Sequence, residues 1–445
     1  MRKPIFTISG LRGVFGEDLK PELVMNYAGY FGRFLGGRNI AIGRDTRASG
    51  PILLHAAVSG LLSTGYKVYN FGICPTPAIV MMVKKLRLDG GIQITASHNP
   101  EEWNGLKLVS GNGRFLFSEE LQALKKYIRS PKRKYHFKLV PRLLHKEIIE
   151  PYLLTIISSK YFKKIRNKNF RVGIDSCNGA AEESATRLVT MLDATPITIQ
   201  KASIGFPRRP EPKGENLKRL CAEVKRHKLD FGIAFDPDGD RFSCVDELGV
   251  PLSEEATVIF AIQFILEQTK GPVVVNNSTT MAVDEICQKY SVPLYRSGTG
   301  EANVVKKMQE VGAIVGGEGN GGVIVPEINL TRDGLVATAI LIKLLSKKNR
   351  PLSVIRKEIP EFFMEKTVTN NYKDDWQKII KKKFSNKPTY KFDKLDGLKI
   401  IGNDFWILIR KSNTEPILRI IVESKNKSLT DKLIKDIMKE ITLKS

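Results

Sequence analysis

The chain of 445 residues contains few cysteines and no long apolar run. The cysteines stand alone, without the paired spacing that is typical of zinc or redox sites. We expect them to be reduced, mostly buried thiols of a cytoplasmic protein. No stretch reaches about 18 consecutive apolar residues, and no sustained apolar segment follows the basic residues near Met1. The sequence therefore predicts neither a membrane span nor a signal peptide.

Acidic residues are scarce relative to basic ones, at 47 Asp and Glu against 71 Lys and Arg, which gives a net charge of +24. The basic residues are spread along the chain, and clusters such as 131–138 and 381–383 are short. No recognisable nucleic-acid-binding module accompanies them, so we expect no nucleic-acid partner. A positive potential instead raises the local concentration of a small anionic substrate, and phosphate is the natural candidate.

One stretch of eight residues, 93–100, ends an apolar run with a polar turn that is closed by Pro100. The run reads as a buried strand, so the hydroxyl of Ser97 would lie at the end of that strand. In a parallel sheet, ligands bind at this end of the strands. The alternative is that Ser97 merely caps a helix that begins at Asn99 or Glu101, because serine is a favoured cap.

A second motif follows the apolar run 231–235 and carries Asp236, Asp238 and Asp240 around Gly239. Three carboxylates on alternate residues repel one another unless a counter-ion lies between them. A hard divalent cation is the usual solution, because its ligands are oxygen atoms. The pattern therefore predicts a metal site.

The same strand–helix–strand unit occurs three times along the chain, which indicates a parallel sheet covered by helices in each copy. The copies span 39–45, 49–63 and 67–71, then 170–175, 180–192 and 196–199, then 273–276, 280–289 and 292–295. Each copy is followed by a further apolar run and a loop, which contains Ser97, Asp236 or the glycine-rich segment 313–322. If the three units are alike, their loops occupy equivalent places and can point into one cleft.

The C-terminal part of the chain is different, with strand-like runs at 406–410 and 417–422 and helical periodicity at 429–441. This pattern predicts a hairpin and a helix in a small α+β domain. The turn of the hairpin offers cationic side chains, hydroxyls and backbone amides, which together suit a phosphate group. The alternative is that this turn is polar only because turns in general are polar.

The motifs TASHNP (95–100), DPDGDR (236–241), GEGNGG (317–322) and RKSNTEP (410–416) occur in this order. They resemble those of the α-D-phosphohexomutase family, which includes phosphoglucosamine mutases, phosphomannomutases and phosphoglucomutases. The segments 9–13 and 104–107 agree with it, so the resemblance covers essentially the whole chain. It implies a heart-shaped α/β protein of four domains, namely three similar α/β domains with mostly parallel sheets and a C-terminal α+β domain. We predict boundaries at 1–148, 149–248, 249–362 and 363–445.

The resemblance implies an intramolecular phosphotransferase that interconverts hexose 6-phosphate and hexose 1-phosphate. Ser97 would be phosphorylated in the active enzyme, and hexose 1,6-bisphosphate would serve as activator and intermediate. One Mg²⁺ per chain would be held by Ser97, Asp236, Asp238 and Asp240. Phosphoryl transfer depends mostly on positioning and charge neutralisation, and Arg241 would supply a cation beside the transferring oxygens.

The phosphate-binding residues expected in the C-terminal domain are Arg410, Ser412, Asn413, Thr414 and Arg419. They would grip whichever phosphate of the bisphosphate lies far from Ser97.

Proton transfer requires an acid or a base beside the reacting oxygens. Neighbours in an extended segment point to opposite sides, so we expect His98 to be a poor base for Ser97 and a hydrolase triad to be absent. The resemblance places Lys107 and Arg12 near the reacting oxygens, with Lys107 in proton transfer and Arg12 holding charge. A basic Lys107 needs a lowered pKa, which Arg12 and Mg²⁺ would favour. The alternative is that Lys107 is a surface lysine. The candidate catalytic residues are Ser97, His98, Lys107, Arg12 and Arg241.

Glu318 and Asn320 are the expected sugar-binding residues, because a carboxylate accepts hydrogen bonds from hydroxyls and an amide both donates and accepts. Many family members carry serine and histidine where this chain has Asn320 and Gly322. This chain has no histidine at that position to transfer a proton, so we expect Lys107 to take a larger part in proton transfer.

The glycine-rich loop, with 103–107 and 300–303, resembles the phosphoglucosamine mutase branch, and phosphomannomutase or phosphoglucomutase is the alternative. Remote alternatives are a Mg²⁺-dependent phosphatase that uses an aspartate of the motif 236–241 as nucleophile, and a basic nucleic-acid-binding protein. The expected partners are small hexose phosphates, without nucleic acid or membrane, and the protein could be a monomer or a homodimer.

Overall fold

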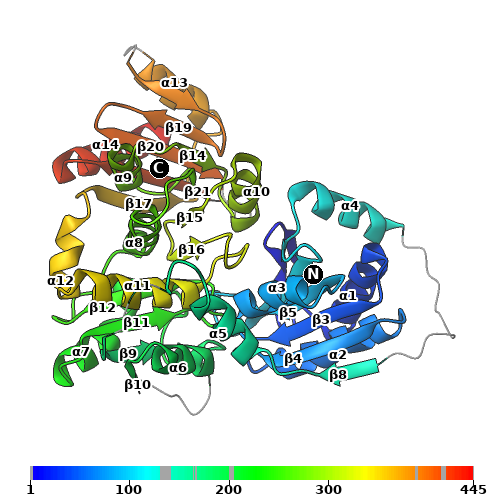
Figure 1. Ribbon diagram of the computed structural model, residues 1–445. Coiled ribbons are helices and arrows are strands. Elements are labelled where there is room, and N and C mark those ends of the chain that lie inside the picture. The colour runs from blue at the N-terminus through cyan, green and yellow to red at the C-terminus, as the bar shows by residue number, and fades with distance from the viewer. Residues whose placement is uncertain are drawn as a thin grey trace.

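The computed structural model describes residues 4–130, 142–163, 165, 168–199, 205–385, 389–411 and 417–443. The strands in these residues form four sheets, three of them in α/β units and one in the C-terminal part (Figure 1). No helix of this described part of the chain has both the length and the apolar character that crossing a membrane requires.

The first sheet has the strand order β1-β2-β6-β5-β3-β4-β8, and β7 pairs with β6 at its side. Its strands are β1 (Ile5–Thr7), β2 (Gly10–Val14), β3 (Asn39–Arg44), β4 (Lys67–Ile73), β5 (Gly90–Ile94), β6 (Trp103–Ser110), β7 (Arg114–Phe115) and β8 (Arg142–His145). Its helices are α1 (Pro21–Leu35), α2 (Gly50–Leu62), α3 (Thr76–Lys85) and α4 (Ser118–Arg129). The sequence explains the ends of α1, because Pro21 suits the first turn and Gly36 adopts the left-handed conformation (φ 69°) that ends many helices.

The second sheet has the order β10-β9-β11-β12 and the third has the order β14-β13-β15-β16. The second unit contains α5 (Ile149–Ile157), β9 (Arg171–Asp175), α6 (Glu182–Met191), β10 (Thr195–Thr198), α7 (Lys218–Arg226), β11 (Phe231–Phe235) and β12 (Phe242–Asp246). The third contains α8 (Glu254–Leu266), β13 (Val273–Asn276), α9 (Ala282–Tyr290), β14 (Leu294–Ser297), α10 (Glu301–Val311), β15 (Val315–Glu318), β16 (Gly322–Ile324), α11 (Gly334–Lys348) and α12 (Leu352–Ile355).

The three α/β units share one topology, which confirms the predicted triplication. In each unit two strands run parallel to a central strand, as β4 and β5 do beside β3, and the next strand is antiparallel, as β6 is beside β5. The second unit repeats this arrangement with β10, β9, β11 and β12, and the third repeats it with β14, β13, β15 and β16. The loops after β5, β11 and β15 therefore lie at equivalent positions.

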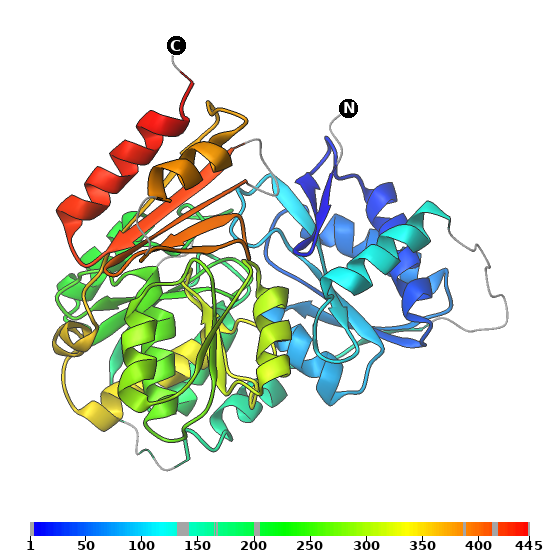
Figure 2. The same ribbon diagram turned by 90° about the horizontal axis from the view of Figure 1, so that it is seen from above.

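The C-terminal unit has an antiparallel sheet with the order β17-β21-β20-β19-β18. Its elements are β17 (Phe363–Thr369), α13 (Trp376–Phe384), β18 (Lys391–Asp393), β19 (Leu398–Ile401), β20 (Phe405–Lys411), β21 (Leu418–Ser424) and α14 (Lys427–Ile441). Both helices cover the same face of the sheet, as Figure 2 shows. Trp376, Ile380 and Ile437 fill the core between the helices and the sheet. The predicted hairpin and helix correspond to β20, β21 and α14.

The three α/β units are held together by one continuous apolar core. It runs from α3 of the first unit through the second unit to α8 and α11 of the third. Helices α8 and α11 are buried on nearly every side, as expected for helices that are apolar all round. This shared core keeps the loops of the three units in a defined relation to one another.

Candidate active site

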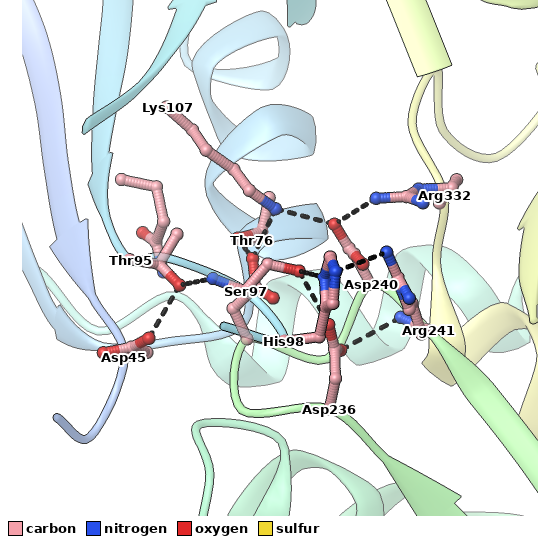
Figure 3. Close-up of polar contacts among 12 residues, drawn as sticks. Asp45, Thr76, Thr95, Ser97, His98, Lys107, Asp236, Asp240, Arg241 and Arg332 are labelled. Atoms are coloured by element: carbon pink, nitrogen blue, oxygen red, sulfur yellow. Dashed lines mark hydrogen bonds and ion pairs between the residues drawn. The ribbon is translucent and has the colours of Figure 1, made fainter. Parts of the chain in front are cut away.

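Loops from the three α/β units border one cavity of about 200 Å³. The residues on its wall include predicted site residues from each of the three units. They are Arg12, Ser97, His98 and Lys107 from the first, Arg241 from the second, and Glu318 and Asn320 from the third. The prediction that the three loops meet is therefore confirmed, and Figure 3 shows part of this arrangement.

The Ser97 loop is a tight turn in which no helix follows. Ser97 has a φ of 51°, in the left-handed region, and the next regular element is β6. The capping alternative is therefore wrong. Ser97 itself is only 1% exposed, but it borders the cavity.

A buried arginine holds this turn in place. The guanidinium of Arg47 donates to the carbonyl oxygens of Ser97 (2.6 Å) and Asn99 (2.8 Å), and also pairs with Asp45 at 3.1 Å. Asp45 accepts a bond from the hydroxyl of Thr95 (2.6 Å), which in turn accepts one from the backbone N–H of Ser97 (2.9 Å). These bonds hold the backbone of Ser97 in its left-handed conformation. The side chain of Ser97 therefore borders the cavity.

The three aspartates of the second loop lie close together and are completely buried. One oxygen from each of Asp236, Asp238 and Asp240 lies within 4.8 Å of the others. Among the described residues, the Oδ1 atoms of Asp238 and Asp240 have no hydrogen-bond partner. Buried carboxylate oxygens without partners are costly, and a divalent cation with oxygen ligands would satisfy them. The donor set therefore fits a hard metal ion.

The hydroxyl of Ser97 joins the first loop to the second. It donates a hydrogen bond to Oδ2 of Asp236 at 2.9 Å, across an interface between two units. The serine and the acidic cluster therefore form one site.

Lys107 is part of this site and is not a surface residue. Its ammonium lies 2.6 Å from Oδ2 of both Asp238 and Asp240, and the residue is 5% exposed. Burial acts to lower the pKa of Lys107, but the two aspartates raise it more strongly, so that the pKa lies above its ordinary value. The expectation of a lowered pKa is thus wrong for the arrangement described here, because two carboxylates outweigh the desolvation of the ammonium.

His98 lies nearer to Ser97 than we expected. Its Nδ1 is 3.4 Å from the Ser97 hydroxyl, and its Nε2 is 3.5 Å from the guanidinium of Arg241. The extended geometry on which the expectation rested is absent, because Ser97 is left-handed. Burial and then the positive charges of Arg241 and Arg12 hold the pKa of His98 well below its usual value, so the imidazole is neutral at pH 7.

Arg12 and Arg241 bring positive charge to the same wall. Arg12 donates to the side chain of Asn99 (2.7 Å), and Arg241 pairs with Glu211 (2.5 Å). Burial lowers the pKa of Arg12 to about 10, with Arg241 acting in the same direction. Both residues have a buried Nε without a hydrogen-bond partner, which leaves donors for an anion.

In the third loop, both carboxylate oxygens of Glu318 have partners, whereas Oδ1 of Asn320 has none among the described residues. Oε1 of Glu318 accepts bonds from the side chain of Asn276 (2.8 Å) and the backbone N–H of Gly300 (3.0 Å). Its Oε2 pairs with Arg332 at 3.0 Å. Asn320, in contrast, has a buried Oδ1 without a partner. Because Asn320 borders the cavity, this oxygen is a candidate acceptor for a hydroxyl or amine.

Several residues of the site carried no recognisable signal in the sequence. Arg332 borders the cavity and pairs with Asp240, and Glu301 lies beside it. Thr76 donates to Oδ2 of Asp238 from the start of α3. Arg332 and Thr76 belong to no motif, and Glu301 lies in the segment 300–303, which resembles a branch of the family but does not indicate a role in the site. The fold brings all three residues to the loops.

The predicted phosphate-binding residues are only partly visible. Arg410 and Arg419 face each other across the β20–β21 hairpin, and Arg410 approaches Asp396 with its Nε at 3.8 Å. Burial lowers the pKa of Arg410, against the opposite effect of Asp396 and of nearby Glu318. Ser412, Asn413 and Thr414 lie outside the described residues.

Comparison with known proteins gives matches to four domain models of one family along the chain. The models for phosphoglucomutase/phosphomannomutase alpha/beta/alpha domains I, II and III match residues 3–134, 150–249 and 253–363. The model for the C-terminal domain of the same family matches residues 367–440.

Single proteins of the same family are also similar to this chain over nearly its full length. A phosphoglucomutase/phosphomannomutase of Thermococcus kodakarensis is 35% identical over 433 residues, which are 95% of each chain. A phosphoglucosamine/phosphogalactosamine mutase of Sulfurisphaera tokodaii is 31% identical over 98% of each chain. The crystal structure of a phosphoglucomutase/phosphomannomutase family protein from Burkholderia thailandensis covers 98% of each chain with a TM-score of 0.85 and 25% identity. The chain therefore belongs to the phosphoglucomutase/phosphomannomutase family and is a phosphohexomutase.

Proposed function

We propose that the protein interconverts glucosamine 6-phosphate and glucosamine 1-phosphate through a phosphorylated Ser97 and a hexose 1,6-bisphosphate. The observation that carries this proposal is the hydrogen bond of 2.9 Å from the Ser97 hydroxyl to Asp236, at the wall of a cavity lined by cations. A carrier hydroxyl has to lie beside the groups that neutralise the charge of a transferring phosphoryl group.

Ser97, Asp236, Asp238 and Asp240 would hold Mg²⁺ in this site. The ion, when bound, neutralises charge on the phosphoryl oxygens during transfer. The partnerless Oδ1 atoms of Asp238 and Asp240 support this role. The ammonium of Lys107 contacts the Oδ2 atoms of Asp238 and Asp240 and so offsets the repulsion between these two carboxylates.

The cationic residues divide the remaining work. Arg12 and Arg241 border the cavity, and each has a buried Nε without a partner among the described residues, so they would hold the negative oxygens of the phosphoryl group. Lys107 moves a proton. Its raised pKa keeps the ammonium protonated, so it would give a proton to the oxygen that leaves phosphorus and regain one from the attacking hydroxyl. Glu318 and Asn320, which border the cavity, would bind the sugar hydroxyls, and Oδ1 of Asn320 is an acceptor without a partner among the described residues.

The bisphosphate has to turn end for end before its second phosphate reaches Ser97. The cavity of about 200 Å³ is smaller than the usual range for ligand pockets of about 300–1,000 Å³. The cleft therefore widens for this step, and Arg410, Arg419 and the turn with Ser412, Asn413 and Thr414 grip the distant phosphate from the C-terminal unit.

The preferred hexose is proposed from the sequence pattern of the sugar loop and from several relatives that are named probable phosphoglucosamine mutases. A relative of similar identity is named phosphoglucomutase/phosphomannomutase, so these hexoses are the second candidates. The three 6-phosphates, assayed side by side with Mg²⁺ and catalytic bisphosphate, separate the two. A kcat/KM at least about tenfold higher for glucosamine 6-phosphate supports the proposal, and a preference for glucose or mannose contradicts it.

The variant Ser97→Ala tests the carrier itself. We expect mutase turnover to vanish while thermal stability remains and Mg²⁺ still binds to the three aspartates, with a lower affinity because one ligand is lost. If the variant instead keeps releasing inorganic phosphate from the hexose phosphate at the wild-type rate, the protein is a Mg²⁺-dependent phosphatase that uses an aspartate.

A further inference from the structure

Arg332 is the residue that connects the acidic loop with the sugar loop. Its Nη2 pairs with Asp240 at 2.8 Å and its Nη1 pairs with Glu318 at 3.0 Å. Its Nε pairs with Glu301 at 3.2 Å. The planar guanidinium thus gives a different nitrogen to each of three carboxylates, which the point charge of a lysine cannot do. Figure 3 shows Arg332 reaching Asp240 from the third unit.

Gly322 makes room for this arginine. A Cβ atom at position 322 would lie 2.2 Å from Cδ of Arg332 and 2.8 Å from its Cγ. The backbone of Gly322 is outside the left-handed region, so its conformation alone does not require glycine. The reason for glycine is space, because the Arg332 side chain fills the volume that any larger residue at position 322 would need.

The position of Arg332 gives it two opposite effects. Its positive charge lies beside Asp240, where it competes electrostatically with a divalent cation. The same guanidinium pairs with Oε2 of the buried Glu318 at 3.0 Å and so orients this carboxylate, which borders the cavity. A single guanidinium therefore acts on the affinity for the cation and on the affinity for the sugar, with opposite signs.

We propose that Arg332 is a positioning residue that couples the metal loop to the sugar loop, and that the absence of a side chain at Gly322 leaves the space that Arg332 occupies. This inference rests on the proposed function in one respect, namely that Asp240 binds the cation and Glu318 binds the sugar. Arg332 acts through these two carboxylates and takes no part in the bond changes at phosphorus.

A double-mutant cycle tests the coupling without turnover. The four proteins are the wild type, Gly322→Ala, Arg332→Ala and the double variant, all in the dephosphorylated state. Calorimetry measures the affinity for Mg²⁺ alone and for glucosamine 6-phosphate alone. Because interacting residues show non-additive effects, Gly322→Ala weakens glucosamine 6-phosphate binding on the order of tenfold in the wild type. The loss is clearly smaller when Arg332 is absent, because the atom closest to the new Cβ is then Oδ1 of Asn320, at 3.1 Å.

The single variant Arg332→Ala separates positioning from general loosening. We expect it to bind Mg²⁺ on the order of tenfold more tightly, because a competing charge has gone, and to bind glucosamine 6-phosphate more weakly. A merely structural role would weaken both. The control is Arg187→Ala, which also removes an arginine that approaches three glutamates, but on the exposed face of α6. Neither affinity changes in the control.

Two results overturn the proposal: an equal effect of Gly322→Ala with and without Arg332, or a loss of Mg²⁺ affinity in Arg332→Ala. If Arg332→Ala does not fold, the cycle is run with Glu301→Gln in all four proteins, which removes one of the carboxylates left unpaired. Absence of mutase turnover in the wild type would refute the proposed function alone, because both affinities are measured without turnover.

Discussion

Arg47 supports the catalytic loop, and its replacement by methionine is predicted to damage both stability and activity. The side chain is completely buried. Its guanidinium donates to the carbonyl oxygens of Ser97, Asn99, Pro100 and Trp103 and pairs with Asp45. Methionine keeps much of the apolar stem but leaves all of these acceptors without the donor.

The magnitude follows mainly from Asp45. Its carboxylate is fully buried, and burial already raises its pKa against the opposite effect of Arg47. Removing one partner of a buried ion pair costs about 3–5 kcal/mol. In the first α/β unit, which contains both residues, such a loss of unfolding free energy lowers the thermal midpoint by about 10 °C. A displacement of the Ser97 hydroxyl by about 1 Å also lowers kcat roughly 10²-fold.

Scanning calorimetry and a mutase assay measure the two effects of Arg47→Met. The added change Asp45→Asn should recover part of the stability, because no buried charge then remains unpaired. The control is Arg44→Met, which removes one bond to the carbonyl of Asp45 from a half-buried residue and costs about 1 kcal/mol. An unchanged thermal midpoint together with an unchanged kcat in Arg47→Met would refute this reasoning.

Three further predictions concern the metal, the phosphate grip and pH. Asp238→Asn should abolish measurable Mg²⁺ binding in calorimetry, and retention of wild-type affinity would exclude Asp238 as a ligand. Arg410→Gln should raise KM for the hexose phosphate on the order of tenfold with little change in kcat, and an unchanged KM in steady-state kinetics would contradict the grip. Burial raises the pKa of Glu255 from 4.5 to about 7, so this residue favours the folded state fully below pH 4.5, and that contribution is lost as the pH rises through 7. Between pH 4.5 and pH 8 the free energy of unfolding of the wild type should therefore fall by up to about 3 kcal/mol more than that of Glu255→Gln, and its thermal midpoint should fall further as well. Parallel pH profiles would show that Glu255 is not the titrating group.

Much of the fold could be predicted because each repeated unit has a strong local pattern. The runs that became β5 and β11 are buried along their whole length, and such short apolar runs between turn residues indicate buried strands. The repetition of strand, helix and strand then fixed the arrangement of each sheet. The ends of the elements moved by only a few residues, as for the helix expected at 49–63 and found at Gly50–Leu62.

The orientation of side chains within the loops was harder to predict. The expectation for His98 assumed an extended backbone, but Ser97 is left-handed because Arg47 and Thr95 hold the turn in that form. The pKa of Lys107 depends on two aspartates that lie more than one hundred positions away in the sequence. Contacts of this kind arise from the packing of one unit on another, which no local pattern records.

Arg332 illustrates the same limit from the other side. The glycine at position 322 was visible in the sequence as a departure from the usual motif, but its reason was not. Only the fold shows that the space beside Gly322 contains the side chain of Arg332. The departure from the usual motif at Gly322 is therefore explained by Arg332, which lies outside that motif.

The central claim is that Ser97 is the temporary carrier of the phosphoryl group, and peptide mapping tests it most directly. The protein is incubated with radiolabelled hexose 1,6-bisphosphate and Mg²⁺, digested and mapped, beside Ser97→Ala. The account predicts one acid-stable label on the peptide that contains Ser97, its transfer to added glucosamine 6-phosphate, and no label in the variant. Label on an aspartate of the 236–240 loop, or full turnover with no label on Ser97, would contradict it.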